Sequence, residues 1–143
     1  MAIANLHETI QSHIMRRNQL NLELTQLESQ KSLAIYAQGD LQRLFSEEKG
    51  SVINYFKDLF ENDEDLQCQY IDYTELPEYE YEMNIILARH EAQLAELTAW
   101  ETAIDAQITT NSTELKEIEA FLESYKGMLS TNISEDFNYG LNG

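Results

Sequence analysis

The sequence predicts an all-α fold: a long antiparallel helical hairpin, or coiled coil, with short helices in an acidic connecting region. Three observations lead to this prediction. Apolar residues recur at helical spacing in two long segments, the 143 residues include only five Gly and one Pro, and the composition changes abruptly between the segments. An all-β fold with many tight turns needs more Gly and Pro. The length suits one domain, so we expect residues 1–143 to form a single elongated helical domain.

The charge balance excludes several classes of protein. The chain has 26 Asp and Glu against 9 Lys and Arg, a formal net charge of -17. So few basic residues cannot track a phosphate backbone, and nucleic acid is therefore not an expected partner. No apolar run approaches the roughly 20 residues of a membrane span. The first 21 residues lack the apolar stretch of a cleavable signal peptide, which leaves the location open between the cytoplasm and export without such a peptide.

The first predicted helix covers residues 5–38. Asn5 and Glu8 have the spacing of a capping box, in which the Asn side chain accepts a hydrogen bond from a backbone N–H of the first turn. Gly39 and Asp40 provide a plausible end of the helix. Three leucines at steps of four and three are expected to form an interaction seam with another helix: Leu20, Leu24 and Leu27.

A second set of apolar residues lies on a different side of this helix: Met15, Leu22 and Leu33. An apolar stripe slowly rotates around a long helix, and this drift would explain their position. A second contact face would explain it as well. Two long helices enclose little interior, so apolar surface is expected to remain available for another helix. We interpret these three residues as a possible second face.

The connecting region, residues 39–77, is acidic and includes a short predicted helix at about 51–60, where apolar residues again recur at helical spacing. No Lys or Arg occurs between Lys57 and Arg89. Carboxylates and tyrosines are interleaved there, and seven of them form a possible partner-binding tip, which we call the acidic tip: Asp63, Glu64, Asp65, Tyr70, Tyr73, Tyr79 and Tyr81.

The acidic tip has more than one interpretation. Its carboxylates could simply be a solvated surface, could dock a basic protein partner, or could bind a cation, although the match to a calcium-binding loop is poor. Tyrosine is enriched at protein interfaces, so the four rings could contact a partner. They could equally pack the tip onto the two long helices.

The third segment predicts a long heptad helix over residues 78–129, followed by a frayed tail at 130–143. From Met83 onward, apolar residues alternate at steps of four and three for more than six heptads, which is typical of a left-handed coiled-coil seam. Pro77 suits the first turn. Residues 109–113 look locally like a loop, but the unchanged phase favours one continuous helix. The expected seam residues are Leu87, Leu94, Leu97, Ile104, Ile108, Leu115, Ile118 and Leu122.

We expect no catalytic, cofactor or metal site. The single cysteine, Cys68, has no neighbouring base, and the sequence contains no nucleotide-binding or hydrolase motif. His13 and His90 fall on seam positions, where a polar residue commonly fixes the register of helix pairing. Glu101 and Asn111 interrupt the seam in the same way.

These patterns predict a non-enzymatic structural or interaction protein that acts by self-association or helix pairing, as a homo-oligomer. Long terminal helices around an elaborated middle are also similar in layout to the subunits of filamentous or exported assemblies. The Trp-x-Gly turn of small secreted hairpin proteins is absent, because Glu101 and Thr102 follow Trp100. The alternative is an acidic adaptor or chaperone-like module that binds a basic protein through the acidic tip.

Overall fold

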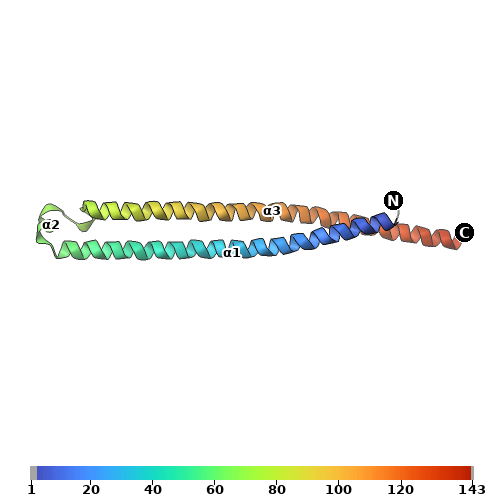
Figure 1. Cartoon of the computed structure of the whole chain (residues 1–143), viewed down its shortest axis with the longest axis horizontal. Helices are drawn as coiled ribbons and strands as arrows, with labels where there is room; N and C mark the ends of the chain where they lie inside the picture. Colours follow the sequence, from blue (N-terminus) through green and yellow to red (C-terminus); the bar gives the residue numbers. More distant parts are fainter. Residues whose placement is uncertain (1–2, 143) are drawn as a thin grey trace. The chain divides into compact units, whose positions relative to one another are not determined.

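The computed structural model of this protein describes residues 3–142, with side chains from residue 3 to residue 135. It is a helical hairpin in which helix α1 (Ile3–Glu61) packs against helix α3 (Pro77–Asn142), as Figure 1 shows. The described part of the chain contains no β-strand. The predicted fold class is therefore confirmed.

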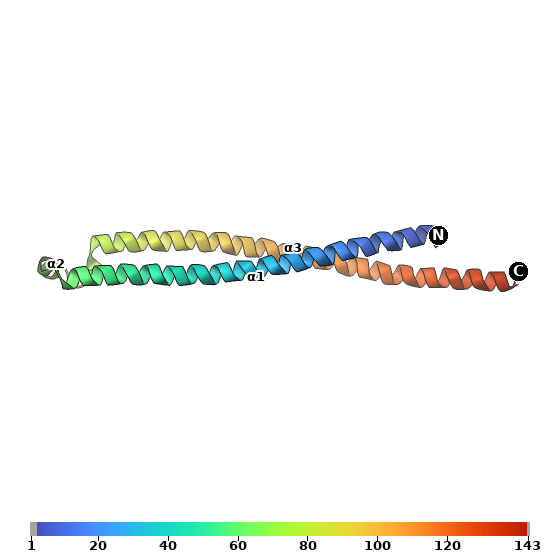
Figure 2. The ribbon, with the colours of Figure 1, turned by 60° about the horizontal axis from the view of Figure 1, so that its bottom comes forward.

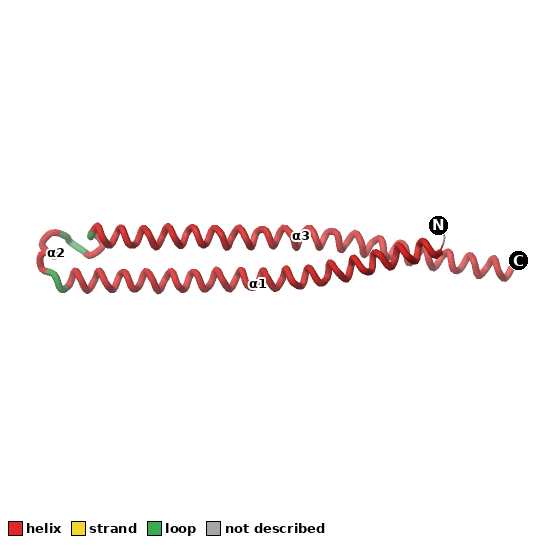
Figure 3. Tube along the Cα trace, viewed as in Figure 1, coloured by secondary structure: helices red, strands yellow, loops and turns green. Residues whose placement is uncertain are grey.

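Short elements connect the two long helices: α2 (Glu64–Gln69) and a 3₁₀ turn, η1 (Tyr73–Glu75). Figure 3 shows that the loop segments of the described chain are confined to this connection. The side chain of Asp63 accepts hydrogen bonds from two backbone N–H groups at the start of α2, and Asp72 caps η1 in the same way. Side-chain caps satisfy donors that a helix start leaves without partners.

The helix contacts group into two compact units, which we describe separately: unit 1 (residues 1–31 and 103–143) and unit 2 (residues 32–102). Each unit contains one segment of α1 and one segment of α3. The two segments are antiparallel in both units, because partners further along α1 lie earlier in α3. Arg16 pairs with Glu114 and Lys31 with Asp105 in unit 1. Gln38 contacts Glu101, and Glu48 contacts Arg89, in unit 2.

The core of unit 1 is a narrow apolar seam between α1 and α3. One cluster of buried residues comprises Leu6, Ile10, Leu20, Ile118 and Leu122, and Leu27 and Ile104 are buried as well. Ile14, Leu115, Tyr125 and Leu129 are partly buried against this cluster. Because only two helices meet, each buries one stripe and leaves the opposite stripe in contact with solvent. Figure 2 shows that the C-terminal end of α3 extends beyond the N-terminal end of α1.

The core of unit 2 combines aliphatic side chains with aromatic rings near the connection. Phe56 is buried, and its ring lies nearly perpendicular to that of Tyr79, with a centroid distance of 5.7 Å. Tyr79 in turn meets Tyr73 at 5.4 Å. Leu76 and Ile86 are also buried. These edge-to-face contacts are a favourable arrangement of aromatic rings, and they attach the connection to the two long helices.

Helix α1 differs from the expectation by continuing through Gly39 and joining the short helix at 51–60. Neither Gly39 nor Gly50 has a positive φ angle, so both are ordinary helical residues. A glycine within a helix costs roughly 0.5–1 kcal/mol relative to Ala. Packing of Ala34 and Leu41 on either side of Gly39 keeps the chain helical, because tertiary burial outweighs a propensity term of that size.

Helix α3 is continuous through residues 109–113, as the unchanged heptad phase predicted. The hydroxyl groups of Thr110 and Thr113 donate to backbone carbonyls four residues earlier, which satisfies these polar side chains within the helix. The helix also continues past residue 129 and ends at Asn142, where the sequence suggested a frayed tail. Gly127 lies within the helix and does not break it.

Replacing Gly39 with Ala tests the continuity of α1. A Cβ atom at this position would meet nothing within 4 Å, so Ala adds helix propensity without a clash. We expect the free energy of unfolding to rise by about 0.5–1 kcal/mol, measured by urea denaturation. Gly39→Pro is the opposing control and should lower it by about 3 kcal/mol or more. A destabilising Gly39→Ala would show that α1 bends or ends here in solution.

Candidate interaction surfaces

The predicted seam of α3 faces α1 throughout unit 1. Ile104, Ile118 and Leu122 are buried, and Ile108 and Leu115 are half-buried. Their steps of four and three match the repeat of 3.5 residues that keeps one stripe against a partner helix. In unit 1 these residues therefore form the inner face of the hairpin.

The same repeat is displaced in unit 2. Leu87 and Leu94 are each 37% exposed, whereas Ile86 is buried and Leu97 half-buried. A straight α-helix has 3.6 residues per turn and drifts by about 20° per heptad relative to a repeat of 3.5. This drift moves the contact toward the residue preceding Leu87. Part of the predicted seam is therefore available to solvent in unit 2.

The matching seam of α1 is longer than the sequence analysis recognised. Leu20 and Leu27 are buried and Leu24 is half-buried. Steps of four and three extend from Leu6 to Val52, but five of these positions are polar and all five are half-buried: His13, Arg17, Lys31, Gln38 and Glu48. These polar residues hid the repeat. Counting steps regardless of residue type would have revealed it.

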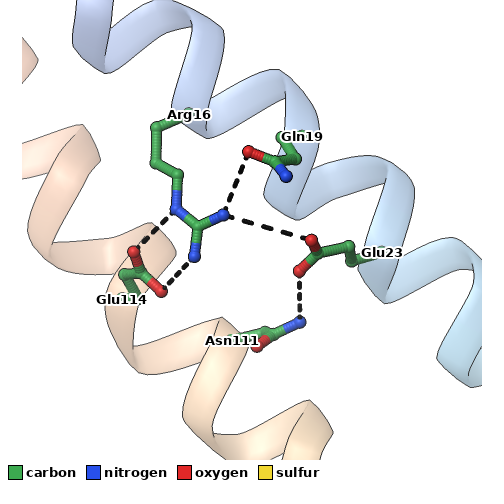
Figure 4. Close-up of polar contacts among 5 residues, drawn as sticks. All are labelled: Arg16, Gln19, Glu23, Asn111 and Glu114. Carbon is green, nitrogen blue, oxygen red and sulfur yellow. Dashed lines mark hydrogen bonds and ion pairs between the residues drawn. The ribbon is translucent and has the colours of Figure 1, made fainter.

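A polar network bridges α1 and α3 in unit 1 (Figure 4). The Arg16 guanidinium donates to both carboxylate oxygens of Glu114, from Nε at 2.8 Å and from an η nitrogen at 2.9 Å. Its other η nitrogen donates to Gln19 and lies 4.0 Å from Glu23. Asn111 completes the network by donating to Glu23 at 3.2 Å. This two-point Arg–carboxylate geometry fixes the register of the two helices.

The network shifts the pKa of both charged partners. The hydrogen bond from Arg16 is the main cause that lowers the pKa of the Glu114 carboxyl; it outweighs desolvation, which raises this pKa, and the Arg16 charge adds a smaller lowering effect. The same bond raises the pKa of Arg16. Both side chains are more than a third exposed, so solvent screening keeps the contribution to stability small. The network selects one alignment of the helices more than it stabilises the fold.

Further polar contacts join the helices along both units. Lys31 Nζ lies 2.7 Å from an Asp105 carboxylate oxygen in unit 1. In unit 2, Gln38 donates to Glu101 at 2.7 Å, and Arg89 contacts Glu48. Glu101 and Asn111, the residues that interrupt the predicted seam, thus each bond to a side chain of α1. Their predicted role in fixing the register is consistent with these contacts.

The two seam histidines lie in different units and pack against aromatic rings. His13 Nδ1 lies 2.8 Å from the Thr9 carbonyl oxygen, and its ring meets the edges of Phe121 and Tyr125. His90 stacks on Phe45 with centroids 4.0 Å apart. Its Nδ1 is buried and has no hydrogen-bond partner among the described residues. A buried polar atom without a partner lowers stability.

The acidic tip divides into a packed part and an exposed part. Tyr73 and Tyr79 contact each other, and burial is the main cause that raises the pKa of the Tyr79 hydroxyl. Asp63 is engaged as the cap of α2. The exposed part includes three residues of the predicted tip, Glu64, Asp65 and Tyr81, while Tyr70 is half-buried. Ile71, which the sequence analysis did not select, is 89% exposed.

The possible second face of α1 is strongly exposed. Met15 is 73% exposed, Leu22 60% and Leu33 59%. Met15 and Leu22 belong to unit 1 and Leu33 to unit 2. Three large apolar side chains on the outside of one helix are unusual for a chain with so many carboxylates to place there. They are among the large apolar side chains that the hairpin leaves uncovered.

No family model, curated protein or solved structure matches this chain. Across residues 3–142, neither long helix has a stretch sufficiently apolar, over sufficient length, to cross a lipid bilayer. Among the same residues, no three His, Cys, Asp or Glu side chains gather closely enough to hold a metal ion.

The lowered pKa of Glu114 predicts a pH dependence of stability. Its ionised form is stabilised in the folded state, so this contribution is present above the unfolded pKa of about 4.3 and is lost as the pH falls through the folded pKa. Glu114→Gln should therefore lower the free energy of unfolding at pH 7, and its difference from the unmodified protein should shrink on acidification. Urea denaturation between pH 7 and pH 3 measures both.

Glu117→Gln is the matched control for this pH series, because it removes the same charge from an exposed position of α3. Its difference from the unmodified protein should not follow the same titration. Identical pH profiles for the two variants would refute the assignment to the Arg16 contact. Raised salt should also reduce the Glu114→Gln effect.

Proposed function

We propose that this chain is a non-enzymatic structural or interaction protein that acts by pairing its helices with other chains, first of all with copies of itself. One observation carries the proposal. Among the described side chains, sixteen large apolar residues are exposed, whereas the buried core comprises eleven apolar residues. Of the exposed residues, Met15 and Leu22 lie on one line along α1 in unit 1, and apolar side chains that gather on one outer face mark an interaction site. The exposed residues therefore indicate that the hairpin acts as part of a larger bundle.

Two kinds of helix pairing are involved. Pairing within one chain lets the hairpin fold, and pairing between chains would cover the apolar residues that the single hairpin leaves exposed. Its seam provides an aligned pair of helices, and a second hairpin would add two more and cover the outer stripes, as in a four-helix bundle. Residues such as Leu94, at a predicted seam position but partly exposed, would gain burial by this addition. A contact that closes on itself gives a defined homo-oligomer, and one that does not close gives a filament.

Measuring the solution mass against protein concentration tests the proposal. Size-exclusion chromatography with light scattering, from micromolar to near-millimolar protein, should show a mass above that of the 16.6 kDa chain and rising with concentration. Electron microscopy of the concentrated sample then separates a closed oligomer from a filament. A monomer throughout this range, in low and moderate salt, would refute self-association.

A second candidate function is the adaptor that binds a basic protein through the acidic tip. The observation that favours it is the exposure of Ile71 in the same short connection that exposes Glu64 and Asp65, because an apolar anchor in an acidic segment suits a protein-binding surface. Such a contact depends strongly on salt, since its attraction is screened over roughly 10 Å at 0.1 M ionic strength.

Neutralising exposed carboxylates of the tip tests the adaptor function. The probe is a fluorescent basic amphipathic peptide, titrated at low salt. Glu64→Gln/Asp65→Asn should weaken its binding several-fold, while Asp63 is kept because it caps α2. The control, Glu117→Gln/Glu123→Gln, removes the same charge from exposed positions of α3. Equal weakening by both pairs would mean that only net charge matters, and the adaptor function would be dropped.

A further inference from the structure

The outward face of α1 in unit 1 carries no charged residue from Gln11 to Ser29, a stretch that begins after the exposed Glu8. Over more than two heptads, the positions that point away from α3 are all exposed and hold only apolar or uncharged polar side chains. We call this surface the uncharged α1 face. Its residues are Gln11, Ser12, Met15, Asn18, Gln19, Leu22, Thr25, Gln26 and Ser29. The outward positions of a surface helix are normally where charges gather, so this composition requires an explanation.

The absence of charge on this face contrasts with the many carboxylates in the rest of the chain. Of the 26 carboxylates, sixteen lie in unit 2, which has only four Lys and Arg. The α1 segment of unit 1 has three carboxylates and three basic residues. Arg16 and Lys31 pair with carboxylates of α3, and Arg17 occupies a half-buried seam position. The numbers of acidic and basic residues in this segment are thus equal, and Arg16, which also donates to Gln19 at the edge of the face, is neutralised by Glu114 of α3.

Two large apolar side chains stand in the middle of this face. Met15 and Leu22 are seven residues apart, so they lie two turns apart on the same line along the helix. Amide and hydroxyl side chains surround them and can exchange hydrogen bonds with a partner without any buried charge. An apolar centre with an uncharged polar rim is the composition of a protein–protein contact.

We propose that the uncharged α1 face binds the same face of a second copy, so that α1 packs against α1 about a two-fold axis. This inference rests on the proposed self-association and specifies its surface. Two chains of charge -17 repel each other, and repulsion is least where neither chain presents a carboxylate. A contact between two identical uncharged faces meets that condition, and it also brings four large apolar side chains together.

The outward face of α3 in unit 1 is the alternative surface for the second copy. It is also uncharged over a shorter stretch, but its residues are small: Ala103, Ala106, Thr109, Thr110 and Thr113. Packing α1 of one copy against this surface would bury two large apolar side chains where the α1-to-α1 contact buries four. The larger apolar area favours the symmetric contact.

In unit 2, the outward positions of α1 continue with the same composition. Ser32, Leu33, Tyr36 and Gly39 are exposed and uncharged, and Asp40 is the first charged residue. Leu33, the third member of the predicted second face, is thus placed among uncharged neighbours like Met15 and Leu22.

Opposite charges placed on the uncharged α1 face test the proposal. The acidic variant is Met15→Glu/Leu22→Glu and the basic variant is Met15→Lys/Leu22→Lys. Each should raise the dissociation constant of self-association by roughly tenfold or more, because like charges then meet across the two-fold axis. Mixing the two variants should restore association, since Glu then faces Lys. Sedimentation velocity measures all three samples, and circular dichroism checks that the exposed substitutions leave the helix content unchanged.

The control pairs place the same charges on the outward face of α3, as Ala106→Glu/Thr110→Glu and Ala106→Lys/Thr110→Lys. They should leave association unchanged. An acidic variant of the α1 face that still associates like the unmodified protein would overturn the α1-to-α1 contact and leave self-association standing. Failure of the mixture to restore association, or equal disruption by the α3 pairs, would overturn it as well. An unmodified protein that stays monomeric would overturn both proposals.

Discussion

The structure depends on one geometric constraint: a hairpin of two helices can bury only one stripe of each helix. α1 and α3 satisfy it in unit 1 with a repeat of 3.5 residues that keeps one stripe in contact, whereas in unit 2 the contact on α3 moves from Leu87 to Ile86. Burial is therefore confined to a line of residues, of which Leu6 and Leu20 are the most fully enclosed. Everything else on the two helices is surface, and the composition of that surface decides what the molecule does.

Polar residues inside the seam have a different role from the apolar ones. The contacts of Arg16 with Glu114, and of Asn111 with Glu23, are partly exposed and contribute little free energy, but each is satisfied in only one alignment of the helices. An apolar seam alone tolerates a shift by one heptad, since Leu meets Leu again. The polar network disfavours such a shift of one helix along the other. The residues on the outer faces of the two helices therefore keep one alignment.

The sequence predicted the fold class and the start of α3 at Pro77 because heptad phase and proline geometry are local properties. It did not predict the continuity of α1 through Gly39, where a local helix-breaking tendency is outweighed by packing that only the folded hairpin provides. The α1 seam was recognised only at its leucines, because Lys31 and Gln38 occupy seam positions and interact across the hairpin. The exposure of Met15, Leu22 and Leu33 followed from their place on the helix, but what covers them depends on another chain.

The uneven distribution of charge has a consequence for how the molecule opens. Unit 2 holds sixteen carboxylates and four basic residues, against ten and five in unit 1, so repulsion within unit 2 is stronger and grows more as the ionic strength falls. The amide groups of unit 2 should then exchange with solvent before those of unit 1, in separate cooperative steps. Counterions, including divalent cations present at millimolar concentration, would thereby set the local stability of the connection without any dedicated site.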